Sequence, residues 1–326
     1  MDGATTGILL VQVGTPDAPT APAVRRYLRE FLSDPRVVEM NRILWWFILR
    51  LCILPRRPRS SAALYRKIWT DAGSPLLLTT EAQARALEAA LGGAAKVEAA
   101  MRYGNPSIAT ALDKLAAGGA ERILVLPLFP QYSSATTGSV FDAVAARCRK
   151  RRVVPSRRFV RSFHQHPAYI EALTSVAEEE IRRLPWKPER ILFSFHGLPK
   201  RYIEKGDIYE RQVEETVEAL ARALGLEPAQ FRLCYQSRLG RAEWLGPYTM
   251  AVLDGLAKEG VKRVAVQCPG FAADCLETIE EIGSEARRRF IEAGGEDLGL
   301  IPCLNTHPAW IRALETISRE QTAGWM

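Results

Sequence analysis

The stretch Ile191-Leu192-Phe193-Ser194-Phe195-His196-Gly197-Leu198-Pro199 is a mostly apolar run that leads into a histidine and a turn. Such a run is too short and too rich in β-forming side chains for a helix, so it predicts a buried strand. The same order of strand, glycine and proline occurs in Ile8-Leu9-Leu10-Val11-Gln12-Val13-Gly14-Thr15-Pro16. This internal echo predicts a chain built from two similar halves.

Short apolar strands alternate with helical patterns along the chain, which is typical of βαβ units and parallel sheets. The eight expected strands cover residues 8–13, 96–101, 123–128, 159–163, 191–195, 231–235, 261–267 and 298–304. The expected helices cover residues 80–91, 107–117, 140–149, 168–184, 210–224, 247–259, 276–293 and 308–320. Eight strands could close one barrel or form two open sheets, and the echo favours two sheets.

The length of 326 residues leaves room for two domains, and 47% hydrophobic and 25% charged residues are ordinary values for a globular protein. The net charge of +7 includes basic clusters at residues 56–59 and 147–152, which favour anionic partners. For the second cluster a solvated basic face is the simpler explanation. Six cysteines without a C-x-x-C pair, and the absence of a signal-peptide pattern, predict reduced thiols and a cytoplasmic protein.

The longest apolar run spans residues 43–54 and contains the paired tryptophans Trp45 and Trp46. The run is too short to span a bilayer. It is apolar on all sides, so two interpretations stay open: an ordinary core helix, or a segment lying on a membrane surface. In the second case the basic flank would meet lipid head groups, which makes peripheral contact through residues 43–59 at the inner face of the membrane an expectation.

Several well-known functional motifs are missing from the sequence. No G-x-G-x-x-G follows a strand, and there is no G-x-x-x-x-G-K-[ST], G-x-S-x-G or H-E-x-x-H. These absences argue against dinucleotide binding, nucleoside triphosphate binding, serine hydrolases and zincins. Because no nucleic-acid-binding motif is present either, we expect no nucleic acid partner.

His196 is one of four histidines and follows a predicted strand at its carboxyl end, where open parallel sheets bind ligands. A later strand end leads into an acidic helix, on which Asp274, Glu277, Glu281 and Glu285 fall within roughly an 80° arc. Two structural explanations stay open: a capping box formed by the first two acids, and a solvated face formed by the others. The functional alternative is that imidazole accepts a proton while the carboxylates relay a hydrated divalent cation.

Nine segments, taken together and in order, resemble the ferrochelatase family, whose members insert ferrous iron into a porphyrin to make haem. The resemblance runs from residue 7 to about residue 313, which is nearly the whole chain. No segment is specific by itself. The segments are residues 8–16, 73–76, 101–104, 130–133, 194–199, 206–209, 235–238, 244–247 and 268–281.

The resemblance implies an α/β fold with two similar Rossmann-like domains, each a four-stranded parallel sheet flanked by helices, and an active-site cleft between them. We expect the first domain at residues 1–148 plus 299–326, with the last strand and helix returning to it, and the second at residues 149–298. The implied activity is that of a lyase in porphyrin and haem biosynthesis. Fe²⁺ would enter protoporphyrin IX and two protons would leave, in the last step of haem formation.

The resemblance also assigns roles to individual residues. His196 matches the catalytic histidine and Glu277 its partner acid, and the metal-handling set is His196, Glu277, Asp274 and Glu281 on a helix distorted toward a π-helix. The positions that match the porphyrin pocket are Val13, Arg57, Tyr65, Ser74, Arg102, Tyr103, Tyr132, Trp244 and Phe271. Among them, Arg57 and Arg102 suit the propionate carboxylates, because a guanidinium fork matches a carboxylate.

The chain departs from the family pattern at two positions. Cys275 stands where many relatives have a histidine, although a helical wheel turns it toward the apolar face. Val13 replaces the tyrosine or methionine of some relatives, which leaves protoporphyrin and coproporphyrin both open; we favour protoporphyrin. Because four dispersed thiolates would have to meet, a [2Fe–2S] cluster is not expected, and Fe²⁺ is expected only as a substrate.

Two other functions remain open. One is a different tetrapyrrole chelatase, which would insert cobalt or nickel. The other is a non-catalytic porphyrin or haem carrier, which would not need His196 together with Glu277. For an enzyme, we favour His196 as a proton acceptor that contacts iron transiently, in a monomer rather than a homodimer.

Overall fold

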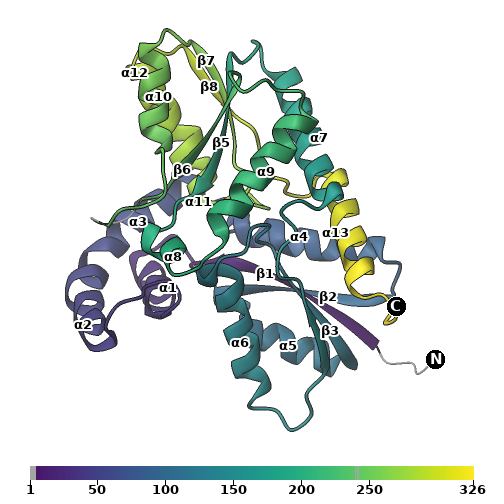
Figure 1. The fold of residues 1–326 in the computed structure, drawn as a ribbon. Coiled ribbons are helices and arrows are strands. Elements are labelled where there is room, and N and C mark those ends of the chain that lie inside the picture. The colour runs from purple at the N-terminus through teal and green to yellow at the C-terminus, as the bar shows by residue number, and fades with distance from the viewer. Residues whose placement is uncertain (1–4, 239, 241) are drawn as a thin grey trace. The chain divides into compact units, whose positions relative to one another are not determined.

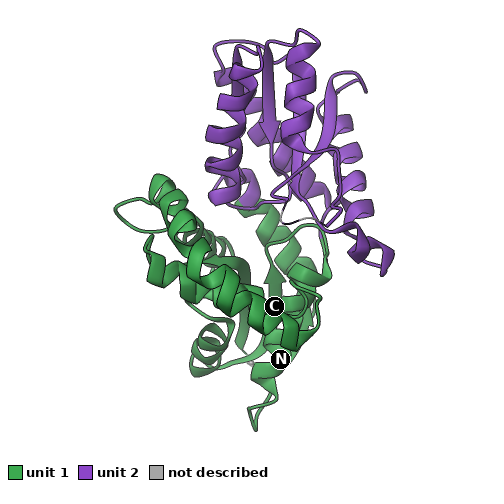
Figure 2. Ribbon diagram, turned by 90° about the vertical axis from the view of Figure 1, so that its left-hand side faces the viewer, with its two compact units in different colours: residues 1–162, 311–326 green, residues 163–310 purple. Residues whose placement is uncertain are grey.

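The computed structural model describes residues 5–238, 240 and 242–326, and the chain divides into two compact units. Unit 1 comprises residues 1–162 and 311–326, and unit 2 comprises residues 163–310 (Figure 2). Each unit has its own four-stranded parallel sheet with helices packed against it (Figure 1). The prediction of two similar α/β halves is confirmed.

The sheet of unit 1 has the strand order β2-β1-β3-β4. Its strands are β1 (Thr5–Thr15), β2 (Ala95–Gly104), β3 (Ala120–Pro127) and β4 (Ser156–Phe159). The central strand β1 is buried over residues 6–12, which explains its nearly continuous apolar sequence. Near its carboxyl end Gly14 has a φ of 117°, and a Cβ there would lie 1.8 Å from the carbonyl oxygen of Tyr103, so only glycine fits.

Among the described residues of unit 1, eight α-helical or π-helical elements precede β4, and a ninth lies mostly after residue 310. They are α1 (Ala21–Ser33), α2 (Arg42–Phe47), η1 (Ile48–Ile53), α3 (Leu54–Ile68), α4 (Pro75–Ala90), α5 (Ile108–Ala117), η2 (Ser134–Gly138), α6 (Ser139–Cys148) and most of α13 (Pro308–Gln321). The elements η1 and η2 are π-helical.

The sheet of unit 2 has the order β6-β5-β7-β8, so β5 takes the place that β1 holds in unit 1. Its strands are β5 (Arg190–His196), β6 (Phe231–Gln236), β7 (Arg263–Gln267) and β8 (Asp297–Leu300). The two stretches that share a glycine and a proline in the sequence are therefore equivalent strand ends. The helical elements are α7 (Pro167–Arg183), α8 (Lys200–Glu204), α9 (Tyr209–Ala223), α10 (Thr249–Lys258), α11 (Leu276–Ile279), η3 (Glu281–Ala286) and α12 (Arg287–Glu292).

The domain boundaries differ from those expected at residues 148/149 and 298/299. Strand β4 pairs with β3, so the first unit continues to residue 162. Strand β8 pairs with β7, so the last strand stays in unit 2 and does not return to the first sheet. The chain crosses back inside α13, after residue 310. The expected strands at residues 159–163 and 298–304 extend beyond the ends of β4 and β8. In both cases the apolar residues that follow the strand lie in an irregular, buried segment.

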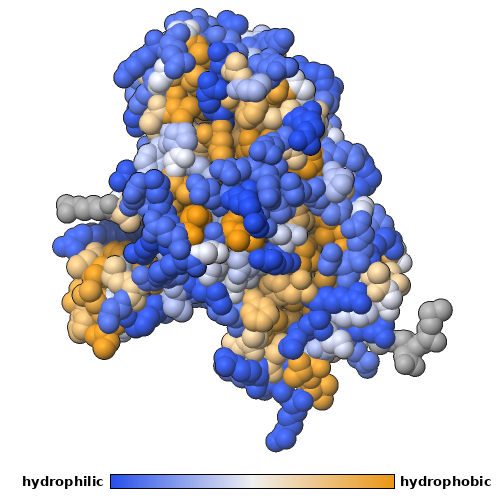
Figure 3. Space-filling model, viewed as in Figure 1, coloured by the Kyte–Doolittle hydropathy of each residue, from blue (hydrophilic) through white to orange (hydrophobic). Residues whose placement is uncertain are grey.

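Residues 43–54 do not form a core helix, and that interpretation is wrong. Trp45, Leu49 and Leu54 face inward, and the Trp45 indole nitrogen donates to the backbone carbonyl of Leu32 at 2.6 Å. Ile48 and Ile53 are half-buried, and the other large apolar side chains lie on the surface, where apolar residues gather over α2 (Figure 3). We call this surface the apolar patch; it consists of Ile43, Leu44, Trp46, Phe47 and Leu51. None of the helices in the described part of the chain combines the length and apolar character needed to cross a bilayer.

Candidate active site

Three adjacent strand ends in unit 2 bring the candidate residues together. Strands β5, β6 and β7 are parallel and adjacent, so their carboxyl ends lie at one edge of the sheet. His196 is the last residue of β5 and lies opposite Gln236, the last residue of β6. The acidic segment follows β7. The strand pattern thus placed His196 correctly, at the edge where a parallel sheet presents its ligand-binding residues.

The backbone fixes the orientation and the tautomer of the His196 ring. Its Nδ1 lies 2.7 Å from the carbonyl oxygen of Gly197. Because a carbonyl oxygen can only accept a hydrogen bond, Nδ1 carries a proton, and the lone pair of the neutral ring is on Nε2. The buried hydroxyl of Tyr209 donates to the backbone carbonyl of His196 at 2.9 Å and anchors the strand end from α9. The ring is therefore arranged to accept a proton through Nε2.

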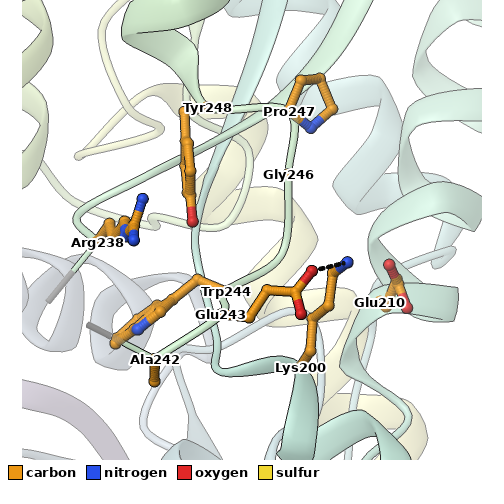
Figure 4. Close-up of a pocket in the computed structure, with 9 residues that line it drawn as sticks. All are labelled: Lys200, Glu210, Arg238, Ala242, Glu243, Trp244, Gly246, Pro247 and Tyr248. Carbon is orange, nitrogen blue, oxygen red and sulfur yellow. Dashed lines mark hydrogen bonds and ion pairs between the residues drawn. The ribbon is translucent and has the colours of Figure 1, made fainter. Parts of the chain in front are cut away.

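Trp244 lies beside His196, with ring centroids 6.4 Å apart. A Cβ on Gly197 would come within 3.3 Å of the indole and within 3.1 Å of the Gln236 carbonyl oxygen, so the glycine permits this close packing. The indole also lines a cavity of about 530 Å³, in which Lys200 pairs with Glu243 at 2.6 Å (Figure 4). Trp244 is thus an apolar surface held next to the candidate proton acceptor.

The acidic helix changes geometry between its two central acids. Glu277 lies in the α-helical turn α11, and Glu281 begins the π-helical segment η3. A hydrogen bond from the Glu285 N–H to the Glu280 carbonyl, five residues earlier, marks the π-helical turn. Such turns are frequent at functional sites because they redirect side chains. The distortion that the family resemblance implied is therefore present.

Glu281 is largely buried and interacts electrostatically with His196 and Glu277. Burial raises the pKa of its carboxyl group, while hydrogen bonds from Ser237 and the charge that His196 carries when protonated lower it. The negative charge of Glu277 raises the pKa further. Glu281 therefore lies close enough to both His196 and Glu277 to interact with them electrostatically, as shared handling of a proton or a cation requires.

Asp274 has a different environment from these acids. Its Oδ1 accepts hydrogen bonds from Thr278 at 3.0 Å and from the Cys303 N–H at 3.3 Å. Its Oδ2 accepts from Asn305 at 2.7 Å. The expected capping box of Asp274 with Glu277 is wrong: the reciprocal box is made by Cys275 and Thr278. Asp274 thus holds the loop to the helix start.

Cys275 is buried rather than open to the strand edge. Only 5% of the residue is exposed, and burial raises its pKa well above the ordinary thiol value. This agrees with its position toward the apolar face of the helical wheel. Burial likewise raises the pKa of Cys234 to about 11 and raises the pKa values of Cys268 and Cys303 well above the ordinary thiol value.

The four expected metal-handling residues do not form a ready-made cage. Across the described residues, no group of three or more histidines, cysteines or acids is arranged to hold a metal ion. Two of the four, Asp274 and Glu281, already accept hydrogen bonds from protein groups. Glu285, the last acid of the stripe, is exposed.

In unit 1, two of the expected porphyrin-pocket residues belong to a buried polar network. Asp34, at the end of α1, accepts hydrogen bonds from Arg102 at 2.5 Å, from Tyr103 at 2.8 Å and from Ser139 at 2.6 Å. Arg102 also donates to the Ser139 carbonyl. Ser74 is buried as well, and its hydroxyl donates to Thr15. Arg102 and Tyr103 therefore hold α1 to β2.

Arg57 contrasts with Arg102. It is half-buried in α3 near Tyr65, and burial lowers the pKa of its guanidinium group. No carboxylate of the described chain pairs with it. A half-buried cation without an anion suits an incoming carboxylate. Val13 is the one partly exposed residue among residues 6–15 of β1.

The remaining pocket candidates have apolar or cationic neighbours. Tyr132 lies under the Arg161 guanidinium, 5.1 Å from the ring centroid, in unit 1. Phe271 is partly buried and packs against the core of unit 2. Sequence reasoning missed Tyr209, Gln236 and Ser237 as supports of the site. The last two lie in the quoted segment 235–238, but their contacts depend on strand pairing that no local pattern reveals.

Comparisons with known proteins agree on one family. The family model described as Ferrochelatase matches residues 5–322. Two relatives named Ferrochelatase, from Herminiimonas arsenicoxydans and Methylibium petroleiphilum, are each 52% identical to this chain. The matches extend over 323 and 321 residues, which in both cases is 98% of this chain and 88% of the relative.

Solved structures agree on the fold. SirB from Bacillus subtilis with Fe³⁺ has a TM-score of 0.59 and 14% identity, covering 98% of this chain and 96% of that one. The sirohydrochlorin chelatase SirB of the subspecies spizizenii, in complex with cobalt, has a TM-score of 0.54 and 11% identity, covering 97% and 95%. At these identities the likeness concerns the fold alone.

Proposed function

The chain belongs to the ferrochelatase family and is therefore an enzyme that inserts metal into porphyrin; from this premise we propose that it inserts Fe²⁺ into protoporphyrin IX. The observation that carries the catalytic assignment is the Nδ1 contact of His196 with the Gly197 carbonyl, which leaves the Nε2 lone pair for a proton. Free-base porphyrin carries two N–H protons that must leave as the metal enters. His196 accepts the first of them.

Glu277 and Glu281 complete the acid–base group. Glu281 interacts electrostatically with both His196 and Glu277, so a proton taken by the imidazole is stabilised by a nearby carboxylate. The same oxygens are hard ligands that suit a ferrous ion in transit. Asp274 contributes by holding the loop before α11, through the hydrogen bonds that its carboxylate accepts from Thr278 and Asn305.

Binding of the ring depends on an apolar grip and on charge. Bending the macrocycle exposes its nitrogens, and binding energy from the periphery offsets the cost of the distortion. Trp244 and Val13 offer partly exposed apolar surface for this purpose. Arg57, rather than Arg102, pairs with a propionate group, because its guanidinium has no carboxylate partner in the described chain.

The enzyme needs no resident cofactor in this proposal. Cys234, Cys268, Cys275 and Cys303 are all buried. These four side chains are better explained as small apolar residues of the core. Fe²⁺ acts as a substrate.

The apolar patch is proposed to rest on an anionic membrane surface from the cytoplasmic side. Ile43 and Leu51 are 72% and 64% exposed, and the exposed arginines Arg50, Arg56 and Arg59 flank the patch. Apolar side chains with a basic margin match an interface that has hydrocarbon below anionic head groups. Such contact would bring the enzyme to the place where an apolar tetrapyrrole collects.

Anaerobic metallation tests the proposed activity. Purified full-length protein is mixed with Fe²⁺ and protoporphyrin or coproporphyrin, and loss of free-base fluorescence is followed. We expect turnover well above background and faster with protoporphyrin. Tight binding without turnover would indicate a carrier. Turnover of a corrin precursor with cobalt or nickel, but not of porphyrin with iron, would indicate another chelatase.

A further inference from the structure

Ser237 holds the Glu281 carboxylate through two separate donors. Its backbone N–H donates to Oε1 at 2.7 Å, and its hydroxyl donates to Oε2 at 2.5 Å. Both oxygens of the acid are therefore fixed by one residue, immediately after the end of β6. Charge-assisted contacts of this kind are among the stronger hydrogen bonds in proteins, and two together define the plane of the carboxylate.

The backbone of Ser237 is arranged in an unfavourable conformation to make these contacts. Its φ is 65°, in the left-handed region that side chains other than glycine rarely adopt. Within the described chain the only other such residue that is not glycine is Asn305, and it holds Asp274. Both strained residues thus hold acids of the segment 274–281. Strain that persists in this way is a frequent feature of functional sites.

The neighbouring residue holds the same helix one turn earlier. Gln236 donates from Nε2 to the backbone carbonyl of Glu277 at 2.6 Å, and its Oε1 accepts from Ser194 at 2.6 Å. The Glu277 carbonyl lies where the α-helical turn gives way to the π-helical one, and carbonyls at a helix end need outside donors. Gln236 and Ser237, which we call the β6 clamp, therefore fix the helix on both sides of this change.

We propose that Ser237 is a positioning residue, which fixes the Glu281 carboxylate beside His196 so that it can share the proton or guide the metal. The proposal rests on the proposed function and adds to it a residue that touches neither substrate nor reacting atoms. Without the hydroxyl, Glu281 keeps one donor and can rotate about its side-chain bonds. It would then turn toward the cavity of about 280 Å³ that it helps to line, together with Arg238 and Arg289.

A double-mutant cycle tests whether Ser237 acts through Glu281. The variants are Ser237→Gly, Glu281→Ala and the double variant, assayed by anaerobic metallation in the full chain. Glycine suits the left-handed backbone, so Ser237→Gly removes the hydroxyl without adding strain. We expect kcat to fall about tenfold in Ser237→Gly, with the KM for porphyrin within about twofold of the wild-type value. The double variant should be no slower than Glu281→Ala.

Ser284→Ala is the matched control, because Ser284 is an exposed serine on the same π-helical segment. It should keep kcat within about twofold and should combine additively with Glu281→Ala. Wild-type kcat in Ser237→Gly, or additive losses in its cycle, would overturn the positioning role and leave the proposed function standing. Absence of turnover in the wild-type enzyme would instead contradict the proposed function itself.

Discussion

Arg102 donates to Asp34 at 2.5 Å inside unit 1, and only 18% of the arginine side chain and 5% of the aspartate side chain are exposed. Removing one partner of a buried pair leaves the other charge without compensation. We therefore expect Arg102→Ala to lower the free energy of unfolding by about 3–5 kcal/mol. Urea unfolding followed by circular dichroism measures this loss, and an unchanged midpoint would contradict the structural role.

Arg57→Ala should weaken porphyrin binding and leave stability almost unchanged, which is the reverse of the effect expected for Arg102→Ala. Loss of a charge-assisted contact with a propionate should raise the KM for porphyrin about tenfold to a hundredfold. The free energy of unfolding should change by less than about 1 kcal/mol, since no protein carboxylate loses a partner. Arg56→Ala, the exposed neighbour, is the control and should leave KM unchanged. An unaltered KM in Arg57→Ala would remove this residue from the binding site.

The buried carboxyl of Glu281 should make stability depend on pH. Its pKa in the folded state is raised, mainly by burial, so the folded protein binds this proton more tightly than the unfolded chain. The resulting stabilisation is complete below the unfolded pKa near 4.5 and is lost as pH rises through the folded value. Glutamine does not titrate, so Glu281→Gln does not lose this stabilisation as the pH rises. The Tm of Glu281→Gln relative to wild type should therefore increase from pH 4.5 to pH 7.5, and a constant difference would contradict the assignment.

The apolar patch predicts binding to anionic vesicles. Replacing Trp46 and Phe47 by serine should lower partitioning onto phosphatidylglycerol vesicles by at least about tenfold, because each buried aromatic side chain contributes about 1.5–3 kcal/mol. Salt should weaken the remaining attraction of the flanking arginines. Phe141→Ser provides the control, since Phe141 is 56% exposed elsewhere in unit 1. Vesicle sedimentation measures the partitioning. An equal loss of partitioning in Phe141→Ser, or no binding of the wild-type protein to the vesicles, would contradict the proposal.

Much of the fold follows from local patterns. Short apolar runs bounded by glycine and proline marked the strands, and the equivalence of residues 8–16 with 191–199 indicated two sheets before any pairing was known. The errors occurred at β4 and β8, where the expected strands ran on into irregular segments that contain buried apolar residues. Burial alone does not distinguish a strand from an irregular core segment.

The site was predictable in its parts but not in its contacts. The position of His196 follows from the strand pattern, and the acids follow from helical spacing with help from the family resemblance. The difference between Arg57 and Arg102 depends on Asp34, which lies 68 residues from Arg102 in the sequence. The grip of Ser237 on Glu281 depends on strand order and on a π-helical turn. Such long-range contacts have no signature in a single sequence.

The central claim is that His196 accepts a porphyrin proton through Nε2, and single-turnover metallation of His196→Ala tests it most directly. Porphyrin binding, followed by fluorescence before Fe²⁺ is added, should stay within about threefold of wild type. The metallation rate should fall by about 10²–10⁴, the range typical of a lost general base. A variant that binds porphyrin and metallates it at the wild-type rate would contradict the account.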